Sequence, residues 1–266
     1  MPATPSDPVV LTLADLRAEV RAGELVSFRL GGHEFMHGPD QPGWGHADTE
    51  MFPVVGPTAE IGYRVQVPRG NALLDQHGLL RELPYTLVSV TDTTAVLEKT
   101  YRAGTPVPNS KYPARSTARW QVWPYSFRFE KRFALLPDGM EVSFEVSGDA
   151  DMPFMLGYHP AFDLRTAHPR ITGCGQAITL AAVLAAGDRA FEVMGCETLV
   201  LEDSRRLELS SRGFGHFMLW SPDPGMVCIE PITYYPHSRP LAEMHEGFEY
   251  LGREPRHFSL TFRPLP

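Results

Sequence analysis

The chain has 266 residues, with 32 acidic against 24 basic side chains and a net charge of −8. This balance argues against a nucleic-acid-binding protein, which needs a basic face, and favours small or neutral ligands. No apolar run approaches the roughly 20 residues of a membrane-spanning helix. The first eight residues carry neither the basic start nor the apolar core of a signal peptide. We therefore expect a cytoplasmic protein that is not inserted in a membrane.

The three cysteines, Cys174, Cys196 and Cys228, are odd in number, widely spaced and without a CxxC pair. This spacing does not suit a structural zinc site. We expect them to be buried free thiols in a reducing compartment. The 25 prolines and 23 glycines are scattered along the chain, which favours many short strands joined by turns over long helices.

The N-terminal region alternates between apolar and polar residues, as half-buried strands do. The pattern predicts strands over residues 9–13, 25–30 and 33–36, with a turn at Gly31-Gly32. Residues 13–20 fit either a helical turn or an alternating strand, and a meander of strands is the preferred interpretation.

A polar stretch without periodicity follows over residues 37–50 and contains His37, Trp44 and His46. A long polar loop that carries an aromatic side chain is a candidate binding loop. It leads into a rigid apolar segment over residues 51–57.

Two hairpins are predicted further along the chain. The first spans residues 86–101 with its turn at 91–94, and the second spans 120–146 with Pro137-Asp138-Gly139 at its turn. Five more segments are strand candidates: residues 178–186, 206–211, 213–220, 225–231 and 258–262. With no helix predicted beyond two turns, the expected fold is all-β, one large antiparallel β-sandwich domain over residues 1–266.

Three stretches share one local design, in which an apolar lead-in ends in a polar residue that Gly or Pro follows. They are His77-Gly78, His159-Pro160 and Glu230-Pro231. Because a residue before proline is held extended, His159 and Glu230 are predicted at strand ends. Each residue alone is more often structural, but two imidazoles and one carboxylate on one sheet face make an acid–base set.

Other chemistries fit this set less well. The sequence has no nucleophile elbow and no HExxH spacing. Two histidines and one carboxylate could also form a facial metal triad, although we expect no metal.

Four stretches, taken in order, resemble motifs of the aldose 1-epimerase (mutarotase) family. Residues 51–56 resemble its FPxxG segment, 76–81 its HGFAR-type segment, 157–162 its GxHPYF-type segment and 228–231 its C-[IVL]-E-P segment. The likeness extends over about residues 20 to 262. It implies a galactose mutarotase-like β-sandwich that acts on an aldohexose and needs no cofactor.

The resemblance also implies a role for each residue of the set. His159 would be the general acid that protonates the ring oxygen of a pyranose, and Glu230 the general base for the anomeric hydroxyl. His77 would hold or polarise the sugar. The ring would open to the aldehyde and close again with the hydroxyl on the other face.

Flat aromatic side chains suit the apolar face of a sugar ring. Trp44 and Phe162 are the expected contacts, with Trp120 and Trp123 as further candidates.

Arg81 matches the arginine of HGFAR-type relatives, some of which act on hexose 6-phosphates, and a surface ion pair with Glu82 or another acidic residue is the alternative. Pro57 stands where an FPxxGR subclass has an arginine, so Arg64 or Arg81 would have to supply that contact. The sugar-binding aspartate of the family has no clear counterpart, with Asp188 and Asp203 as possibilities.

Three functions remain open at this point. The leading one is a mutarotase acting on a free aldohexose or on its 6-phosphate. A catalytically silent carbohydrate-binding or regulatory protein could use the same fold. A glycoside hydrolase would need a second carboxylate facing Glu230.

Overall fold

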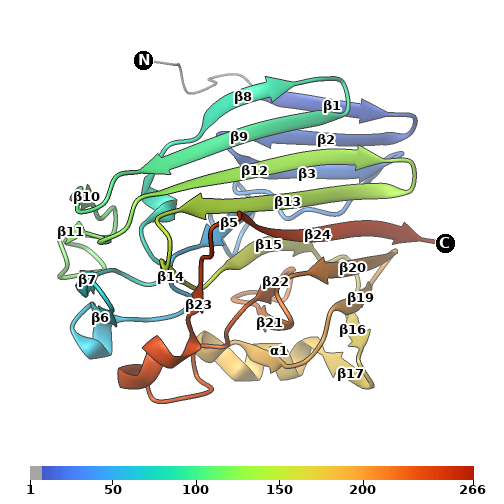
Figure 1. Ribbon diagram of the computed structural model, residues 1–266. Coiled ribbons are helices and arrows are strands. Elements are labelled where there is room, and N and C mark those ends of the chain that lie inside the picture. Colours follow the sequence, from blue (N-terminus) through green and yellow to red (C-terminus); the bar gives the residue numbers. More distant parts are fainter. Residues whose placement is uncertain (1–7) are drawn as a thin grey trace.

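The computed structural model describes residues 8–266, and strands dominate it (Figure 1). Seven of the eight residues that carry the prediction about a signal peptide, residues 1–7, lie outside the described part. Among residues 8–266, the helices are all too short or too polar to cross a bilayer.

The largest sheet has nine strands, and all neighbouring pairs run antiparallel. In spatial order they are β17 (Gln176–Thr179), β16 (Arg170–Gly173), β19 (Thr198–Glu202), β20 (Arg206–Arg212), β24 (Arg256–Leu265), β13 (Gly139–Gly148), β12 (Phe127–Leu136), β9 (Thr94–Tyr101) and β8 (Thr86–Val90). Buried and partly exposed residues alternate along β12 and β13, so one face is apolar and the other charged.

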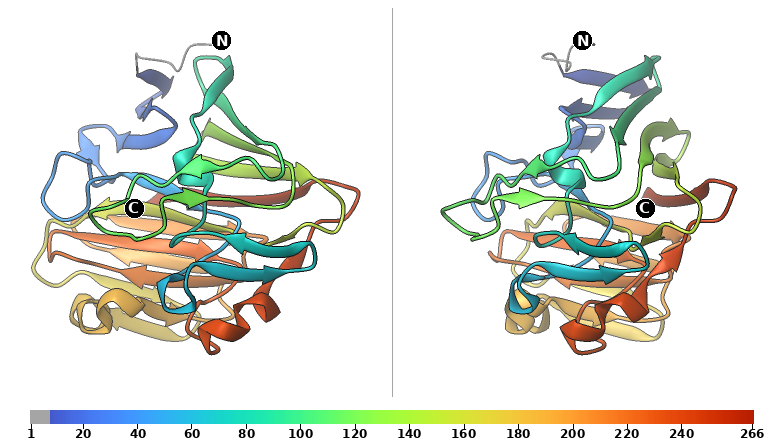
Figure 2. Two further views of the ribbon diagram at one scale, coloured as in Figure 1. Left: turned by 90° about the vertical axis from the view of Figure 1, so that its left-hand side faces the viewer. Right: turned by 60° about the vertical axis from the view of Figure 1, so that its left-hand side comes forward.

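A second sheet of five antiparallel strands lies against the apolar face of the first (Figures 1 and 2). In spatial order it contains β18 (Phe191–Val193), β21 (His216–Trp220), β22 (Met226–Ile232), β15 (Gly157–Asp163) and β5 (Asp48–Met51). Aromatic rings join the layers: Tyr158 lies 5.0 Å from Phe144 and Phe162 lies 5.6 Å from Phe262, between ring centroids. These contacts form the core of the predicted β-sandwich.

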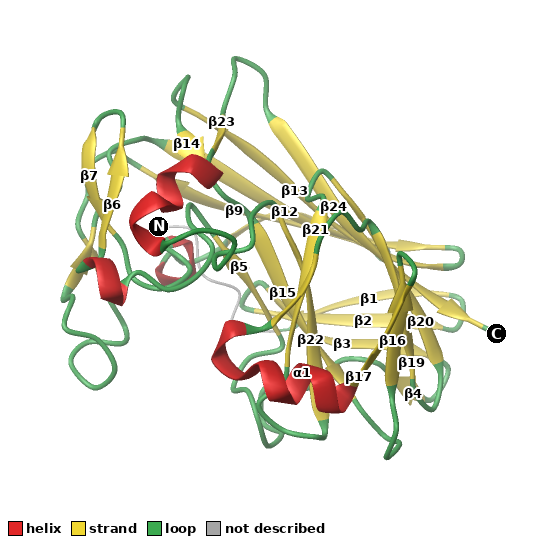
Figure 3. Cartoon of the chain, turned by 90° about the horizontal axis from the view of Figure 1, so that it is seen from below, coloured by secondary structure: helices red, strands yellow, loops and turns green. Residues whose placement is uncertain are grey.

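Smaller elements surround the two sheets. The N-terminal meander contains β1 (Val9–Leu13), β2 (Leu16–Arg21), β3 (Glu24–Leu30) and β4 (His33–Glu34). Three two-stranded sheets pair β6 (Arg64–Val67) with β7 (Gly70–Leu73), β10 (Val107–Pro108) with β11 (Trp120–Gln121), and β14 (Pro153–Phe154) with β23 (Glu249–Tyr250). Figure 3 shows the β6–β7 hairpin at one side and the helix α1 (Leu180–Ala186) below the second sheet. Short 3-10 helices occupy Ala59–Ile61, Leu80–Glu82, Gly187–Arg189 and Leu241–Gly247.

Most predicted strands are confirmed, including the meander and the 86–101 hairpin, but two segments differ. The prediction of a strand over 178–186 is wrong beyond Thr179, where α1 begins. Thr179 caps this alanine-rich helix by accepting a hydrogen bond from the Ala182 N–H, and Leu180 and Val183 are buried on one face. The second hairpin begins at Phe127 rather than at Trp120, which belongs to β11.

The expectation of three free thiols is also wrong. Cys174 and Cys196 form a disulfide with their Cα atoms 5.8 Å apart. Cys174 lies in the β16–β17 turn and Cys196 follows β18, so the fold brings together two turns that are 22 residues apart. Cys228 alone is free, and it is buried as expected.

Candidate active site

The site lies on β15 and β22, neighbours in the five-stranded sheet. His159 and Glu230 are inside these strands rather than at their ends, which corrects the sequence-based expectation. Pro160 and Pro231 lack an N–H group, so they interrupt the hydrogen-bond ladder while the strands continue. The ladder pairs Gly157 with Ile232 and Ala161 with Cys228. Between these pairs the same register places His159 opposite Glu230.

The two side chains form an isolated buried pair. Nε2 of His159 lies 3.4 Å from Oε1 of Glu230, and the exposed fractions are 6% and 0%. Three polar atoms of the pair have no hydrogen-bond partner among the described residues: both carboxylate oxygens of Glu230 and Nδ1 of His159. Buried polar atoms are normally paired, so this pair is available to a ligand.

Burial sets the protonation of this pair. It raises the pKa of Glu230 well above 4.5, an effect that the Arg81 charge only partly offsets. Burial and the Arg81 charge lower the pKa of His159 well below 6.5. Both shifts favour the neutral forms, a protonated Glu230 beside an uncharged imidazole.

Trp44 covers the pair from the 37–47 loop. Its ring stacks on His159 with centroids 4.2 Å apart and an interplanar angle of 28°, while Trp220 meets the same imidazole edge-on at 5.8 Å. Trp44 is half-buried, and residues 41–43 beside it are exposed. The loop predicted to bind a ligand therefore places its aromatic ring over the acid–base pair.

His77 lies next to His159, with ring centroids 6.2 Å apart. Its Nδ1 accepts a hydrogen bond from the Gly56 N–H at 3.1 Å, and burial lowers its pKa well below 6.5. The neutral ring therefore carries its proton on Nε2, 3.2 Å from the side-chain amide of Gln76. Gly78 is required here, because its φ is +75° and a Cβ would lie 2.2 Å from the Phe52 carbonyl oxygen.

Arg81 approaches the site from the 3-10 helix Leu80–Glu82. Its Nε donates to the Glu50 carbonyl at 2.9 Å, while Nη2 is buried without a partner among the described residues. Burial lowers the pKa of Arg81 to about 10, so it stays charged at neutral pH. The alternative of a surface ion pair is not borne out, because Arg81 forms no salt bridge within residues 8–266 and the Glu82 carboxylate accepts from Ser110 instead.

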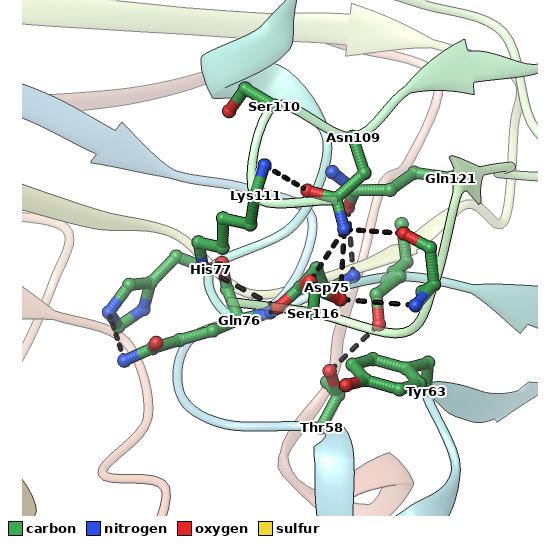
Figure 4. Close-up of polar contacts among 12 residues, drawn as sticks. Thr58, Tyr63, Asp75, Gln76, His77, Asn109, Ser110, Lys111, Ser116 and Gln121 are labelled. Carbon is green, nitrogen blue, oxygen red and sulfur yellow. Dashed lines mark hydrogen bonds and ion pairs between the residues drawn. The ribbon is translucent and has the colours of Figure 1, made fainter. Parts of the chain in front are cut away.

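A polar cavity of about 210 Å³ adjoins His77 through Gln76. Its lining includes Pro57, Tyr63, Asp75, Gln76, Lys111 and Arg115. Asp75 organises it by accepting hydrogen bonds from the Asn109 side chain and the Gln76 N–H, both at 2.6 Å (Figure 4). Lys111 lies 3.4 Å from the same carboxylate.

Comparisons with known proteins bear on the family and the fold of the chain. A family model described as aldose 1-epimerase matches residues 23–181. The chain belongs to the aldose 1-epimerase family. No curated protein matches it.

Solved structures of similar proteins share its fold. A galactose mutarotase-like protein from Lactobacillus casei has a TM-score of 0.78 and 15% identity, over 97% of this chain and all of its own. A galactose mutarotase related enzyme from Lactobacillus acidophilus has a TM-score of 0.73 and 15% identity, over 98% of both chains. A galactose mutarotase-like protein from Clostridium acetobutylicum has a TM-score of 0.67 and 13% identity, over 97% of this chain and 95% of its own. The family resemblance and the β-sandwich fold expected from the motifs are confirmed.

Some aldose 1-epimerase contacts expected from the sequence lie elsewhere. Phe162 points away from the acid–base pair, because successive residues of β15 face opposite sides. It is fully buried against Phe262 and is not available to a sugar. Trp123 is fully buried, and Trp120 is on β11 in a separate two-stranded sheet.

The other polar candidates are not on β15 or β22. Asp203 accepts hydrogen bonds from the backbone N–H groups of Arg165 and Thr166, so it stabilises a turn. Asp188 is in the 3-10 helix Gly187–Arg189, and Arg64 is exposed on β6.

Two residues beside the pair escaped the sequence analysis. Thr49 on β5 pairs with His159 in the ladder, and its buried hydroxyl has no partner among the described residues. Cys228 is two residues before Glu230 on β22, so both face the same side. The strand alternation around the C-[IVL]-E-P motif could have identified Cys228, whereas Thr49 depends on pairing with a distant strand.

Proposed function

We propose that the protein is an aldose 1-epimerase that interconverts the α and β anomers of an aldohexose by general acid–base catalysis. The observation that carries the proposal is the buried His159–Glu230 pair, whose atoms lie 3.4 Å apart and are otherwise largely unpartnered. A binding protein needs hydrogen-bond donors and acceptors for a sugar but no transfer of protons, whereas an acid beside a base serves proton transfer.

The reaction needs one proton removed from the anomeric hydroxyl and one proton added to the ring oxygen. The ring oxygen and the anomeric oxygen share C1, so two groups 3.4 Å apart can contact both at once. Sugar hydroxyls that donate to Glu230 favour its carboxylate, which moves the shared proton to His159. Glu230 then accepts the proton of the anomeric hydroxyl, and His159 protonates the ring oxygen.

The open-chain aldehyde completes the exchange. Rotation about the C1–C2 bond presents the other face of the aldehyde to the ring hydroxyl. Closure reverses both proton transfers. His159 accepts the proton of the ring hydroxyl, and Glu230 donates a proton to the anomeric oxygen. His159 and Glu230 therefore end each turnover in the protonation states in which they began it.

Three further side chains are placed to orient the sugar. The Trp44 ring suits the apolar face of a pyranose and would slide from His159 onto the sugar. The Nε2–H of His77 and the unpartnered Nη2 of Arg81 are donors for sugar hydroxyls. The rest of the substrate would extend past Gln76 toward the adjoining cavity.

The same cavity favours a second candidate, a hexose-6-phosphate 1-epimerase. Lys111 and Arg115 line it on the side of His77, and Arg81 adds a third cation near the pair. Because Asp75 neutralises Lys111, the free hexose remains the primary proposal.

The test follows the approach of fresh α-glucose and α-galactose to anomeric equilibrium by polarimetry or NMR exchange, with the 6-phosphates in parallel. We expect wild-type protein to accelerate at least one sugar. His159→Asn and Glu230→Gln should each lower the rate by about 10²–10⁴-fold. Asp138→Asn changes an exposed carboxylate in the β12–β13 turn of the nine-stranded sheet and should leave the rate unchanged.

Two results would contradict the proposal in different ways. No acceleration of any sugar in a broad panel would reject the enzymatic function. Full activity in both His159→Asn and Glu230→Gln would reject the site while leaving the activity in place.

A further inference from the structure

A free thiol lies beside the acid–base pair and has no part in the proposed reaction. Cys228 and Glu230 face the same side of β22, and His159 faces Glu230 from β15. One ligand atom from each residue, a sulfur, an oxygen and a nitrogen, lies within 4.8 Å of the other two. All three side chains are buried.

These three atoms form a donor set suited to zinc. Thiolate, imidazole nitrogen and carboxylate oxygen are its common protein ligands, and three of them leave a fourth position open. With metal–ligand bonds of about 2.0–2.3 Å, the ligand atoms of a tetrahedral site lie roughly 3.3–3.8 Å apart. The His159–Glu230 contact of 3.4 Å already meets this spacing, and a side-chain shift of roughly 1 Å brings in Cys228.

The surroundings leave these atoms free to bind. Both oxygens of Glu230 lack hydrogen-bond partners among the described residues, and Cys228 is not in a disulfide. Trp44 stacks on the His159 ring from a loop whose residues 41–43 are exposed, so the displacement of Trp44 that the proposed reaction requires would also admit a hydrated ion.

We propose that His159, Cys228 and Glu230 form an inhibitory site for Zn²⁺. Binding releases the thiol proton and the proton shared by the pair to solvent. The ion then occupies the lone pairs that the acid–base reaction needs, so metal and sugar exclude each other. The inhibition rests on the proposed epimerase function, whereas the binding does not.

Cobalt provides a test of binding that is independent of activity. Co²⁺ occupies zinc sites, and a thiolate bound to it absorbs in the near ultraviolet. Because Cys174 and Cys196 are bridged, Cys228 is the free thiol of this three-cysteine chain, and such a band reports on it. We expect a saturable band in wild-type protein without added reductant, no band in Cys228→Ser, and an unchanged band in His257→Gln, which removes an exposed histidine.

Inhibition is measured on the same variants. Zn²⁺ should suppress wild-type anomer exchange, and EDTA should restore it. Cys228→Ser should match the metal-free wild-type rate and need about 10–100-fold more Zn²⁺ for the same inhibition. Cys228→Ala, checked by thermal melting, gives the same comparison if the serine variant is unstable.

The outcomes separate the two proposals. Absence of the cobalt band in wild-type protein, or equal zinc inhibition in wild type and Cys228→Ser, would overturn the metal site. If no sugar is accelerated, the epimerase proposal fails and the cobalt titration still decides whether the metal site exists.

Discussion

The two faces of the five-stranded sheet each carry a buried cluster of ionisable side chains, and only one is internally paired. On the core face, Lys131 is fully buried, with Nζ 2.6 Å from both Asp48 and Glu50. Tyr158 donates to Asp48 at 2.6 Å, and Lys131 also donates to the Gly23 carbonyl. Each charge in this cluster has a counter-charge or a hydrogen bond.

The opposite face is arranged differently, although it is one residue away along each strand. Tyr158 points into the core and His159 out of it, while Thr49 lies between Asp48 and Glu50 on β5. Within residues 8–266, His159 and Thr49 both have buried polar atoms without a hydrogen-bond partner, as does Glu230 across the ladder.

The pKa shifts express the same difference. Burial alone would lower the pKa of Lys131, but Asp48 and Glu50 more than reverse this and raise it above 10.5. Burial raises the pKa of Glu230, and Arg81 offsets only part of the shift. A paired buried charge contributes to structure, whereas an unpartnered one is reserved for a ligand.

Breaking the paired cluster should give the larger effect on folding. Lys131→Met leaves Asp48 and Glu50 facing each other without their main counter-charge, so we expect unfolding free energy to fall by about 3–5 kcal/mol. Urea denaturation followed by circular dichroism measures it. Glu230→Gln is the matched control, and it should keep or raise stability because it replaces a buried carboxyl that has no hydrogen-bond partner among the described residues with an amide of similar shape. Equal stability of Lys131→Met and wild type would contradict the distinction between the two clusters.

The sequence predicted features that depend on neighbouring residues, but not the contacts between distant segments. Alternation found the β12–β13 hairpin, and the polar loop pointed to Trp44. Period-two alternation could also have excluded Phe162, since it lies three residues from His159 on the same strand.

Long-range pairing was beyond local pattern analysis. Lys131 meets Asp48 across 83 residues, and the disulfide joins two turns whose proximity only the sheet order creates. Thr49 reaches the site in the same way, through the pairing of β5 with β15.

Removing the Trp44 ring from His159 should change the pKa of the imidazole. Trp44→Ala exposes His159, so the lowered imidazole pKa should rise back toward 6.5. When solvent protonates the imidazole while Glu230 is also protonated, neither group can accept the proton of the anomeric hydroxyl. The acid limb of kcat/KM should therefore move to higher pH in Trp44→Ala. Loss of stacking worth about 0.5–1.5 kcal/mol should also raise KM up to about tenfold. The control Trp120→Ala should keep the wild-type pH profile. If Trp44→Ala keeps it too, Trp44 does not shield the pair.

The smallest effect is expected where a hydroxyl, rather than a charge, is left unpartnered. Thr49→Val keeps the side-chain shape and removes a buried group without a partner, so stability should hold or improve. If that hydroxyl bonds a sugar hydroxyl, KM should rise by about 2–10-fold with kcat unchanged, the equivalent of about 0.5–1.5 kcal/mol. Thr58→Val is the matched control, because the Thr58 hydroxyl is buried but donates to the Leu74 carbonyl at 2.7 Å. That variant should lose stability instead, by about 1–3 kcal/mol. A loss of stability in Thr49→Val with KM unchanged would place Thr49 with the structural groups of the core face.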